Sequence, residues 1–349
     1  MPLLQVLPTT ERLLRRVDAM AGQPVAMLVD LVADVFVTGT PKRISREAPV
    51  LILSYQGERL TPGGGANAVA NVAALGGRPL PLGIVGDDAH GQGLLADLVA
   101  RGVTAEGIAV RPGYRTPTKV RILGGGRHSI KQQIVRYDIE ETLALTGEDR
   151  ERFTRLLKRW SAEVRVAILS DYGYGAVEPA MLPRVRDALG ERAMLIADSR
   201  YRLGGFVGLD GATPNEEEAE ALLGTTIEDD PERLERAGRG LREQLGARFL
   251  LITRGSRGMS LFRPELSAHL PVSGTDQVAD VTGAGDTVIG TFALALAAGA
   301  DPLEAALLAD YAGGVVVMKM GTATCSPEEL KRAIEADPRP LEELRWGWS

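Results

Sequence analysis

The residues best suited to chemistry lie in the stretch 280–287, DVTGAGDT, which precedes an almost wholly apolar segment, 288–298. The apolar segment predicts a buried helix, and the small residues before it let the backbone approach a ligand closely. The free N–H groups of a helix's first turn, with the positive end of its dipole, form an anion site that suits a triphosphate. Because a carboxylate there would repel phosphate, we interpret Asp286 as a general base for a hydroxyl attacking the γ-phosphate. The alternative is that Asp286 caps the helix.

Short apolar runs, separated by glycine turns and helical stretches, must position this segment. The runs with strand character are 25–32, 80–85, 164–170, 193–198 and 248–253, and a helix is expected at 65–75. Alternation of strands and helices indicates βαβ units, so we predict an α/β fold whose central sheet is mostly parallel. Charged and apolar residues at helical spacing in 10–20 predict an amphipathic helix that packs before the first strand.

Two stretches break the alternation and predict a small antiparallel lid sheet. Two runs flank a connection within 32–55, and the runs 116–123 and 128–138 meet across three glycines that can adopt positive φ. We place the lid strands roughly within 32–60 and 114–140 and expect them to close over a substrate. Basic residues alternate with apolar ones there, so one face of the lid could bind an anion. The alternative is an ordinary solvated face.

Composition and missing motifs exclude several classes of protein. The 349 residues carry 40 Lys+Arg and 46 Asp+Glu, a net charge of −6 without a long basic block, which argues against nucleic acid as a partner. One cysteine and three histidines provide neither an intrachain disulfide nor a zinc cluster, so we expect a cytoplasmic protein. No uncharged apolar stretch reaches membrane-spanning length. The sequence also lacks the P-loop, the GxSxG elbow, HExxH and a dinucleotide fingerprint, so a dehydrogenase is excluded.

Four ordered motifs resemble those of the ribokinase-like (PfkB) family of sugar kinases. They are D-x-T-G-A-G-D at 280–286, a glycine signature at 63–71 with Gly-Asp-Asp at 86–88, N-x-x-E at 215–218, and T-x-G-x-x-G at 253–258. The resemblance implies a ribokinase-like three-layer α/β/α fold with a small β-sheet lid, and the use of ATP with Mg²⁺. We divide the chain into an N-terminal helical extension (1–23), a kinase domain (24–335) and a C-terminal tail (336–349).

Further runs look like the D-glycero-β-D-manno-heptose-7-phosphate kinases of ADP-heptose synthesis. These runs are 43–50, 62–64, 170–172, 280–290, 321–322 and 326–327. That kinase occurs alone or fused to a nucleotidyltransferase, and because the chain stops soon after the kinase motifs we expect a stand-alone kinase. The resemblance implies phosphorylation of the anomeric hydroxyl to give the 1,7-bisphosphate, and a homodimer formed through the lid.

The resemblance also implies roles for individual residues. Asp286 would be the base, with the N–H groups of Gly283, Ala284 and Gly285 stabilising charge on the γ-phosphoryl group. The acceptor would be bound by Asp34, Gly63, Gly64, Asn67, Lys119, Arg121 and Arg136. The nucleotide would lie against Thr253, Arg254, Gly255, Gly258, Ala312 and Gly313. Mg²⁺ would be positioned, through water, by Asn215 and Glu218, whose alternative role is a capped helix start, and a monovalent cation such as K⁺ by Asp280, Thr282 and Ser326.

Two departures from the heptose-kinase pattern concern the acceptor. Where an arginine usually follows the first aspartate after the first strand, this chain has Val35, and Ser199-Arg200 stands where Pro-Lys is usual. A kinase for another sugar, of the ribose or fructose type, is therefore a second hypothesis. A non-catalytic sugar- or nucleotide-binding regulator is a third, against which the intact Asp286, Asn215 and Glu218 argue.

Overall fold

Two sheets organise the part of the chain that this computed structural model describes, residues 7–126, 131–274 and 278–348. The large sheet has ten strands, in the spatial order β14 (Arg345–Trp348), β13 (Leu266–Leu270), β12 (Met259–Phe262), β11 (Phe249–Thr253), β10 (Gly211–Ala212), β9 (Met194–Ser199), β8 (Val166–Asp171), β1 (Pro24–Val29), β4 (Arg78–Gly86) and β5 (Ile108–Arg111). Neighbours from β11 to β5 are parallel, and β11 to β14 are antiparallel. The predicted α/β fold with a mostly parallel sheet is confirmed.

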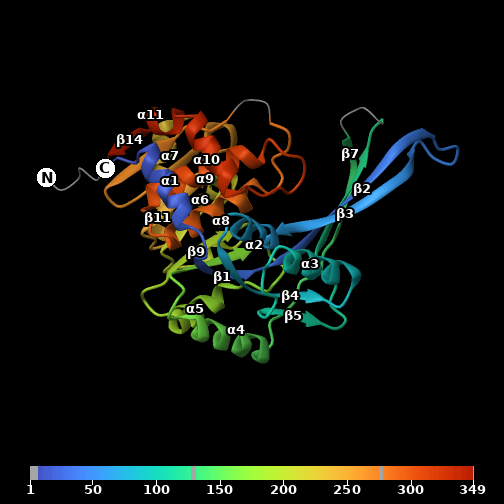
Figure 1. Ribbon diagram of the computed structural model, residues 1–349, viewed down its shortest axis with the longest axis horizontal. Coiled ribbons are helices and arrows are strands. Elements are labelled where there is room, and N and C mark those ends of the chain that lie inside the picture. Colours follow the sequence, from blue (N-terminus) through green and yellow to red (C-terminus); the bar gives the residue numbers. More distant parts are fainter. Residues whose placement is uncertain (1–6, 127–130, 275–277, 349) are drawn as a thin grey trace.

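Helices cover both faces of the large sheet, which gives the three predicted layers (Figure 1). One face packs against α1 (Thr10–Ala19), α2 (Gly65–Ala74), α3 (Ala89–Ala100), α8 (Ala284–Ala297), α9 (Pro302–Val316) and α10 (Pro327–Ala336). The other packs against α4 (Gly147–Trp160), α5 (Leu182–Leu189), α6 (Glu216–Leu223) and α7 (Pro231–Gln244). In β1, Val25 and Met27 enter the first core while Ala26 and Leu28 enter the second, because successive side chains of a strand point to opposite faces.

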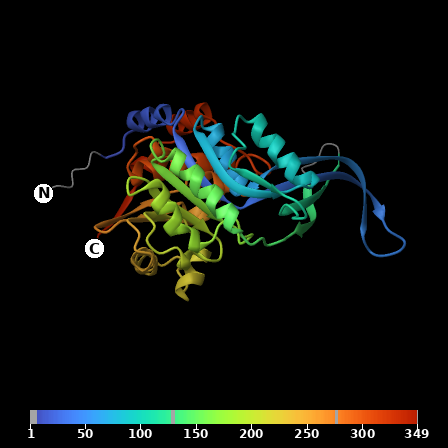
Figure 2. The same ribbon diagram turned by 90° about the horizontal axis from the view of Figure 1, so that it is seen from below.

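The second sheet is the predicted lid, and it projects from the main body (Figures 1 and 2). Its order is β3 (Leu51–Gly64), β2 (Leu31–Ile44), β6 (Thr118–Gly124) and β7 (Gln132–Ile139). As expected, β2 pairs antiparallel with β3 and β6 with β7, whereas β2 and β6 are parallel. Residues 127–130, part of the predicted run 128–138, lie outside the described residues.

The expected strand 25–32 is in fact two strands. β1 ends at Val29 and β2 starts at Leu31, so only Asp30 separates the large sheet from the lid. The division is invisible in the sequence because the apolar run continues through both strands. The lid is therefore a direct continuation of a central strand of the core.

Both ends of the described chain pack onto the large domain. In α1, Arg16 pairs with the fully buried Glu304 of α9 at 3.1 Å. The segment 336–349, predicted as a tail, contains α11 (Arg339–Glu342) and β14, and β14 pairs with β13 at the edge of the large sheet. Among the described residues, no helix is long and apolar enough to cross a membrane.

Candidate active site

Asp286 lies in the first turn of α8 and is buried, with 3% of its surface exposed. The N-cap of this helix is Gly283, at a φ of 79°, so the alternative that Asp286 is the cap is wrong. Its carboxylate accepts hydrogen bonds from Tyr172 Oη at 2.6 Å and from Asn67 Nδ2 at 3.1 Å. Burial raises the pKa of Asp286 to about 7, although these two hydrogen bonds oppose the shift. A carboxylate held from two sides and titrating near neutrality is suited to general-base catalysis.

Tyr172 is a site residue that the sequence did not reveal as one. It follows β8 directly, at the carboxyl end of a central strand, where ligands of parallel sheets gather. The buried Asp30 holds its loop, because the Asp30 carboxylate accepts the N–H groups of Tyr172, Tyr174 and Ala176, each at 2.9 Å. Burial raises the pKa of Asp30 to about 6 against the effect of these amides. The position of Tyr172 after a buried strand was the available signal.

Asn67 connects Asp286 to the predicted acceptor residues of the lid. It sits in the first turn of α2, and its Nδ2 also donates to Gly283 O at 3.2 Å. Gly64 caps α2 at a φ of 50°, which favours glycine. A Cβ on Gly63 would lie 2.6 Å from the Asp34 carboxyl carbon, so only glycine fits beside that carboxylate. The predicted Asp34, Gly63, Gly64 and Asn67 therefore come together.

The three predicted lid cations have different partners. Arg121 Nη1 pairs with the buried Asp34 at 2.7 Å, and Arg136 Nε pairs with Asp138 at 2.7 Å. Burial raises the pKa of Asp34, and Arg121 opposes the shift. The Lys119 ammonium lies 5.4 Å from the centre of the Tyr172 ring, next to the base, and burial lowers its pKa. Thus Lys119 belongs to the base's surroundings, whereas the two arginines are engaged by carboxylates.

On the other side of Asp286 lies a cavity of about 130 Å³. Its lining includes Asp198, Asn215, Glu218, Thr253 and Gly285. Asn215 and Glu218 form the capping box of α6, with the two hydrogen bonds at 2.8 and 2.9 Å, so the predicted capping role is present in the same residues that face the cavity. Burial, and then the charge of Glu218, raise the pKa of Asp198 well above its usual range. Arg200 also lines the cavity, and its charge opposes the rise in the pKa of Asp198 and of Glu218. Carboxylates that repel each other, with an amide oxygen beside them, suit a hard divalent cation.

Those carboxylates do not form a complete metal cage. Among the described residues, no group of three or more His, Cys, Asp or Glu side chains is arranged to hold a metal ion. The predicted contact of Mg²⁺ through water fits this donor set, because this ion keeps several waters.

The remaining predicted nucleotide residues have mainly structural contacts. Arg254 Nε pairs with Glu216 at 2.9 Å. A Cβ on Gly258, at a φ of 78°, would lie 2.0 Å from Leu270 O, and Gly255 adopts a φ of 56° in the same turn. Ala312 and Gly313 lie within α9; Ala312 is fully buried. A ligand could not touch the Ala312 side chain in this arrangement.

The loop before α8 is closed by its own hydrogen bonds. The Ala284 N–H donates to Val281 O at 3.2 Å, whereas Gly285 lines the cavity beside Asn215. The Asp280 carboxylate accepts the N–H groups of Thr282 and Gly321, both at 2.9 Å. The predicted cation residues Asp280 and Thr282 thus share one turn. The third, Ser326, is engaged in a separate capping box that begins α10.

Comparison with known proteins identifies the class. Residues 27–168 and 180–329 match the pfkB family of carbohydrate kinases, and the chain belongs to that family. It is 37% identical over 331 residues to the bifunctional protein HldE of Mesorhizobium japonicum, covering 94% of this chain and 65% of that protein. It is 39% identical over 319 residues to the bifunctional protein HldE of Azotobacter vinelandii, covering 90% of this chain and 64% of that protein. The chain therefore spans somewhat less than two thirds of these relatives.

Solved structures share the fold. Phosphofructokinase-2 from Escherichia coli, in complex with substrates and products, matches with a TM-score of 0.71 at 18% identity, over 90% of this chain and 99% of that one. Ribokinase from Arabidopsis thaliana, complexed with ribose and ATP, matches with a TM-score of 0.69 at 21% identity and the same coverage. The predicted ribokinase-like fold with a lid is confirmed.

Proposed function

We propose that this carbohydrate kinase transfers the γ-phosphoryl group of ATP to the anomeric hydroxyl of D-glycero-β-D-manno-heptose 7-phosphate, giving the 1,7-bisphosphate. The observation that carries the kinase chemistry is the buried Asp286 carboxylate, held by Tyr172 and Asn67 between the acceptor residues of the lid and the Asn215–Glu218 cavity. The choice of heptose rests on the motif resemblance and on relatives that carry the name bifunctional protein HldE.

The reaction needs one proton transfer and one bond exchange. Asp286 accepts the proton of the anomeric hydroxyl while that oxygen forms its bond to the γ-phosphorus. The bond from the γ-phosphorus to the β,γ-bridging oxygen breaks, and ADP leaves with that electron pair. Backbone N–H groups at the start of α8, that of Gly285 foremost, stabilise the charge on the transferred group. Asp34 and Asn67 hold the acceptor's hydroxyls.

ATP is the expected phosphoryl donor of a carbohydrate kinase, and we propose Mg²⁺ as its companion. Asn215 and Glu218 would hold the ion through water beside Asp198, where the charge of the ion would neutralise phosphate oxygens. A monovalent cation near the Asp280–Thr282 turn is a further expectation.

A panel of acceptors tests this function. Purified protein is given ATP and Mg²⁺ with heptose 7-phosphate, fructose 6-phosphate, fructose and ribose, and ADP release is measured in a coupled assay. We expect the highest kcat/KM with heptose 7-phosphate. Preference for an unphosphorylated pentose or hexose would contradict the substrate assignment, and the absence of any sugar-dependent turnover would favour the non-catalytic regulator.

A second substrate, a hexose phosphate, is favoured by one observation. The guanidinium usual after the first aspartate of the lid is missing at Val35, so acceptor contacts differ from the heptose-kinase pattern. Fructose 6-phosphate in the same panel distinguishes this alternative.

We also propose a homodimer formed through the lid. The outer lid strand β7 exposes the apolar residues Ile134, Val135 and Tyr137, at 43%, 48% and 52%. An unpaired strand edge with apolar side chains favours pairing with a second copy. Light scattering at assay concentration should give the mass of two chains, and Ile134→Lys should shift it toward one.

A further inference from the structure

One cross-strand row of the lid carries three arginines on a single face. Phe36 on β2 pairs with Arg59 on β3 and with Arg121 on β6, and Arg121 pairs with Arg136 on β7. Directly paired residues share a face of a sheet. The guanidinium carbons of Arg59 and Arg121 accordingly lie 5.6 and 5.3 Å from the centre of the Phe36 ring. We call Arg59, Phe36, Arg121 and Arg136 the arginine row.

A second row on the same face lies nearer to the base. Its members lie two residues away on each strand, later in β3 and β7 and earlier in β2 and β6: Thr61, Asp34, Lys119 and Asp138. The two rows are therefore about 7 Å apart. Asp34 and Asp138 pair with Arg121 and Arg136, each at 2.7 Å. Arg59 is different, because no carboxylate within the described residues lies within 4 Å of its guanidinium.

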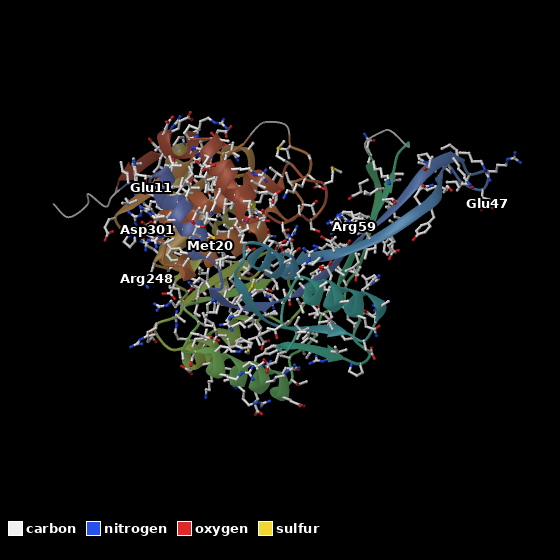
Figure 3. The ribbon with its side chains drawn as sticks, viewed as in Figure 1. Glu11, Met20, Glu47, Arg59, Arg248 and Asp301 are labelled. Atoms are coloured by element: carbon white, nitrogen blue, oxygen red, sulfur yellow. The ribbon has the colours of Figure 1, made fainter. Side chains whose placement is uncertain are left out.

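The arginine row faces a cavity at the lid. This cavity has a volume of about 530 Å³ and is lined on the lid side by Phe36, Arg59 and Arg121. Its other wall includes Asp280, Thr282 and Gly321, from the loops beside the start of α8, and the Asp280 carboxylate accepts the N–H groups of the other two. A Cβ on Gly321 would lie 3.3 Å from Arg59 Nη2, so the guanidinium reaches across to that wall. Figure 3 shows Arg59 where the lid leaves the main domain.

We propose that Arg59, with Arg121 beside it, binds the phosphate monoester of a phosphorylated acceptor. A planar guanidinium matches two phosphate oxygens, and a row of guanidiniums suits a dianion. An acceptor whose hydroxyls meet Asp34 would extend its phosphate one row outward, over the spacing of about 7 Å that a sugar chain can span. Arg59 would thereby supply, from β3, a guanidinium that the sequence lacks at Val35. This assignment rests on the proposed kinase function and identifies Arg59 as a specificity-determining residue.

Binding of matched sugar pairs without ATP tests the assignment. Calorimetry compares heptose 7-phosphate with heptose, fructose 6-phosphate with fructose, and ribose 5-phosphate with ribose. In the unmodified protein, at least one phosphorylated sugar should bind ten times more tightly than its partner. Arg59→Gln should reduce that ratio about tenfold and Arg59→Lys less, since loss of a charge-assisted hydrogen bond has this size. The control is Arg155→Gln, an exposed arginine of α4, which should leave the ratio unchanged.

The outcomes separate this inference from the substrate proposal. Fructose 6-phosphate could show the largest gain in affinity over its unphosphorylated partner, with Arg59→Gln abolishing that gain. The heptose assignment would then be wrong and the phosphate site would be supported. If the ratio is unchanged in Arg59→Gln, or if no phosphorylated sugar binds better than its partner, the phosphate site is wrong. Arg59 is exposed, so the variant should keep the melting temperature of the unmodified protein, and the melting curve is the folding control.

Discussion

The start of α8 and the lid sheet are built in opposite ways. At α8 the Asp286 carboxylate is buried in a mostly apolar helix, and both its oxygens are held by neutral donors from other elements. In the lid, charged side chains stand in rows, and the guanidinium of Arg59 is exposed and free of carboxylates within the described residues. On the proposed function, packing fixes the group that takes the proton, whereas the choice of acceptor depends on side chains that can be exchanged without disturbing a core.

Replacing Asp286, the proposed base, should have the largest effect on turnover. Asp286→Asn keeps the size and the burial of the side chain but cannot accept the hydroxyl proton, so we expect kcat to fall by about 10³. ATP binding, measured by calorimetry, should be retained. Asp187→Asn, on the exposed face of α5, is the control and should be fully active. Equal turnover of Asp286→Asn and the unmodified protein would show that the base is another group.

Breaking the buried ion pair between Arg121 and Asp34 should cost the most stability. Arg121→Met leaves the Asp34 carboxylate buried without its counter-charge, and we expect the free energy of unfolding to fall by about 3 kcal/mol. The matched control is Arg115→Met, since Arg115 pairs with Glu141 at 3.1 Å at the surface and should contribute less than about 1 kcal/mol. Urea denaturation measures both. Similar losses of unfolding free energy in the two variants would contradict the contrast between the buried and the exposed ion pair.

The hydrogen bond from Tyr172 should control the pH at which the base becomes active. Asp286 must be ionised to accept a proton, so kcat should be lost as the pH falls through about 7. The Tyr172 hydroxyl lowers the pKa of Asp286, and Tyr172→Phe should move this limb upward by about one pH unit. We expect about fivefold lower kcat at pH 7 and near-normal kcat at pH 9. A loss independent of pH would mean that Tyr172 acts only by packing.

Lys119 connects the two regions, and its removal should have the smallest of these effects. Its positive charge also lowers the pKa of Asp286, but from a greater distance than the hydroxyl of Tyr172. Lys119→Gln should therefore move the acidic limb upward by a few tenths of a unit, about twofold in kcat at pH 7. A shift larger than that of Tyr172→Phe would show that Lys119 affects the pKa of Asp286 more than Tyr172 does.

The sequence was informative where function lies in consecutive residues. The motif at 280–287 and the apolar segment after it predicted the buried helix and the small residues before it, and singled out Asp286, because a turn and a helix are local properties. The same reasoning predicted the strands, the lid and the capping box at Asn215. From the sequence, Asp286 could also have been the N-cap, because the sequence does not show that Gly283 begins the helix.

Contacts that depend on strand register could not be predicted from the sequence. The register of the β2–β3 pairing decides which residue of β3 stands opposite Phe36, and no single-sequence pattern gives that register. Arg59 was therefore missed, while Arg136 was expected to be available and is engaged by Asp138. Tyr172 was missed for a related reason, since its partner lies 114 residues away in the chain.

The single residue between β1 and β2 connects the lid to the loop that carries Tyr172. Asp30 ends a core strand, begins the lid and holds the backbone of the loop that carries Tyr172. A change in its backbone torsions would tilt the lid and pull on three amides of that loop at the same moment. On the proposed function, Asp30 therefore couples acceptor binding at the lid to proton abstraction by Asp286.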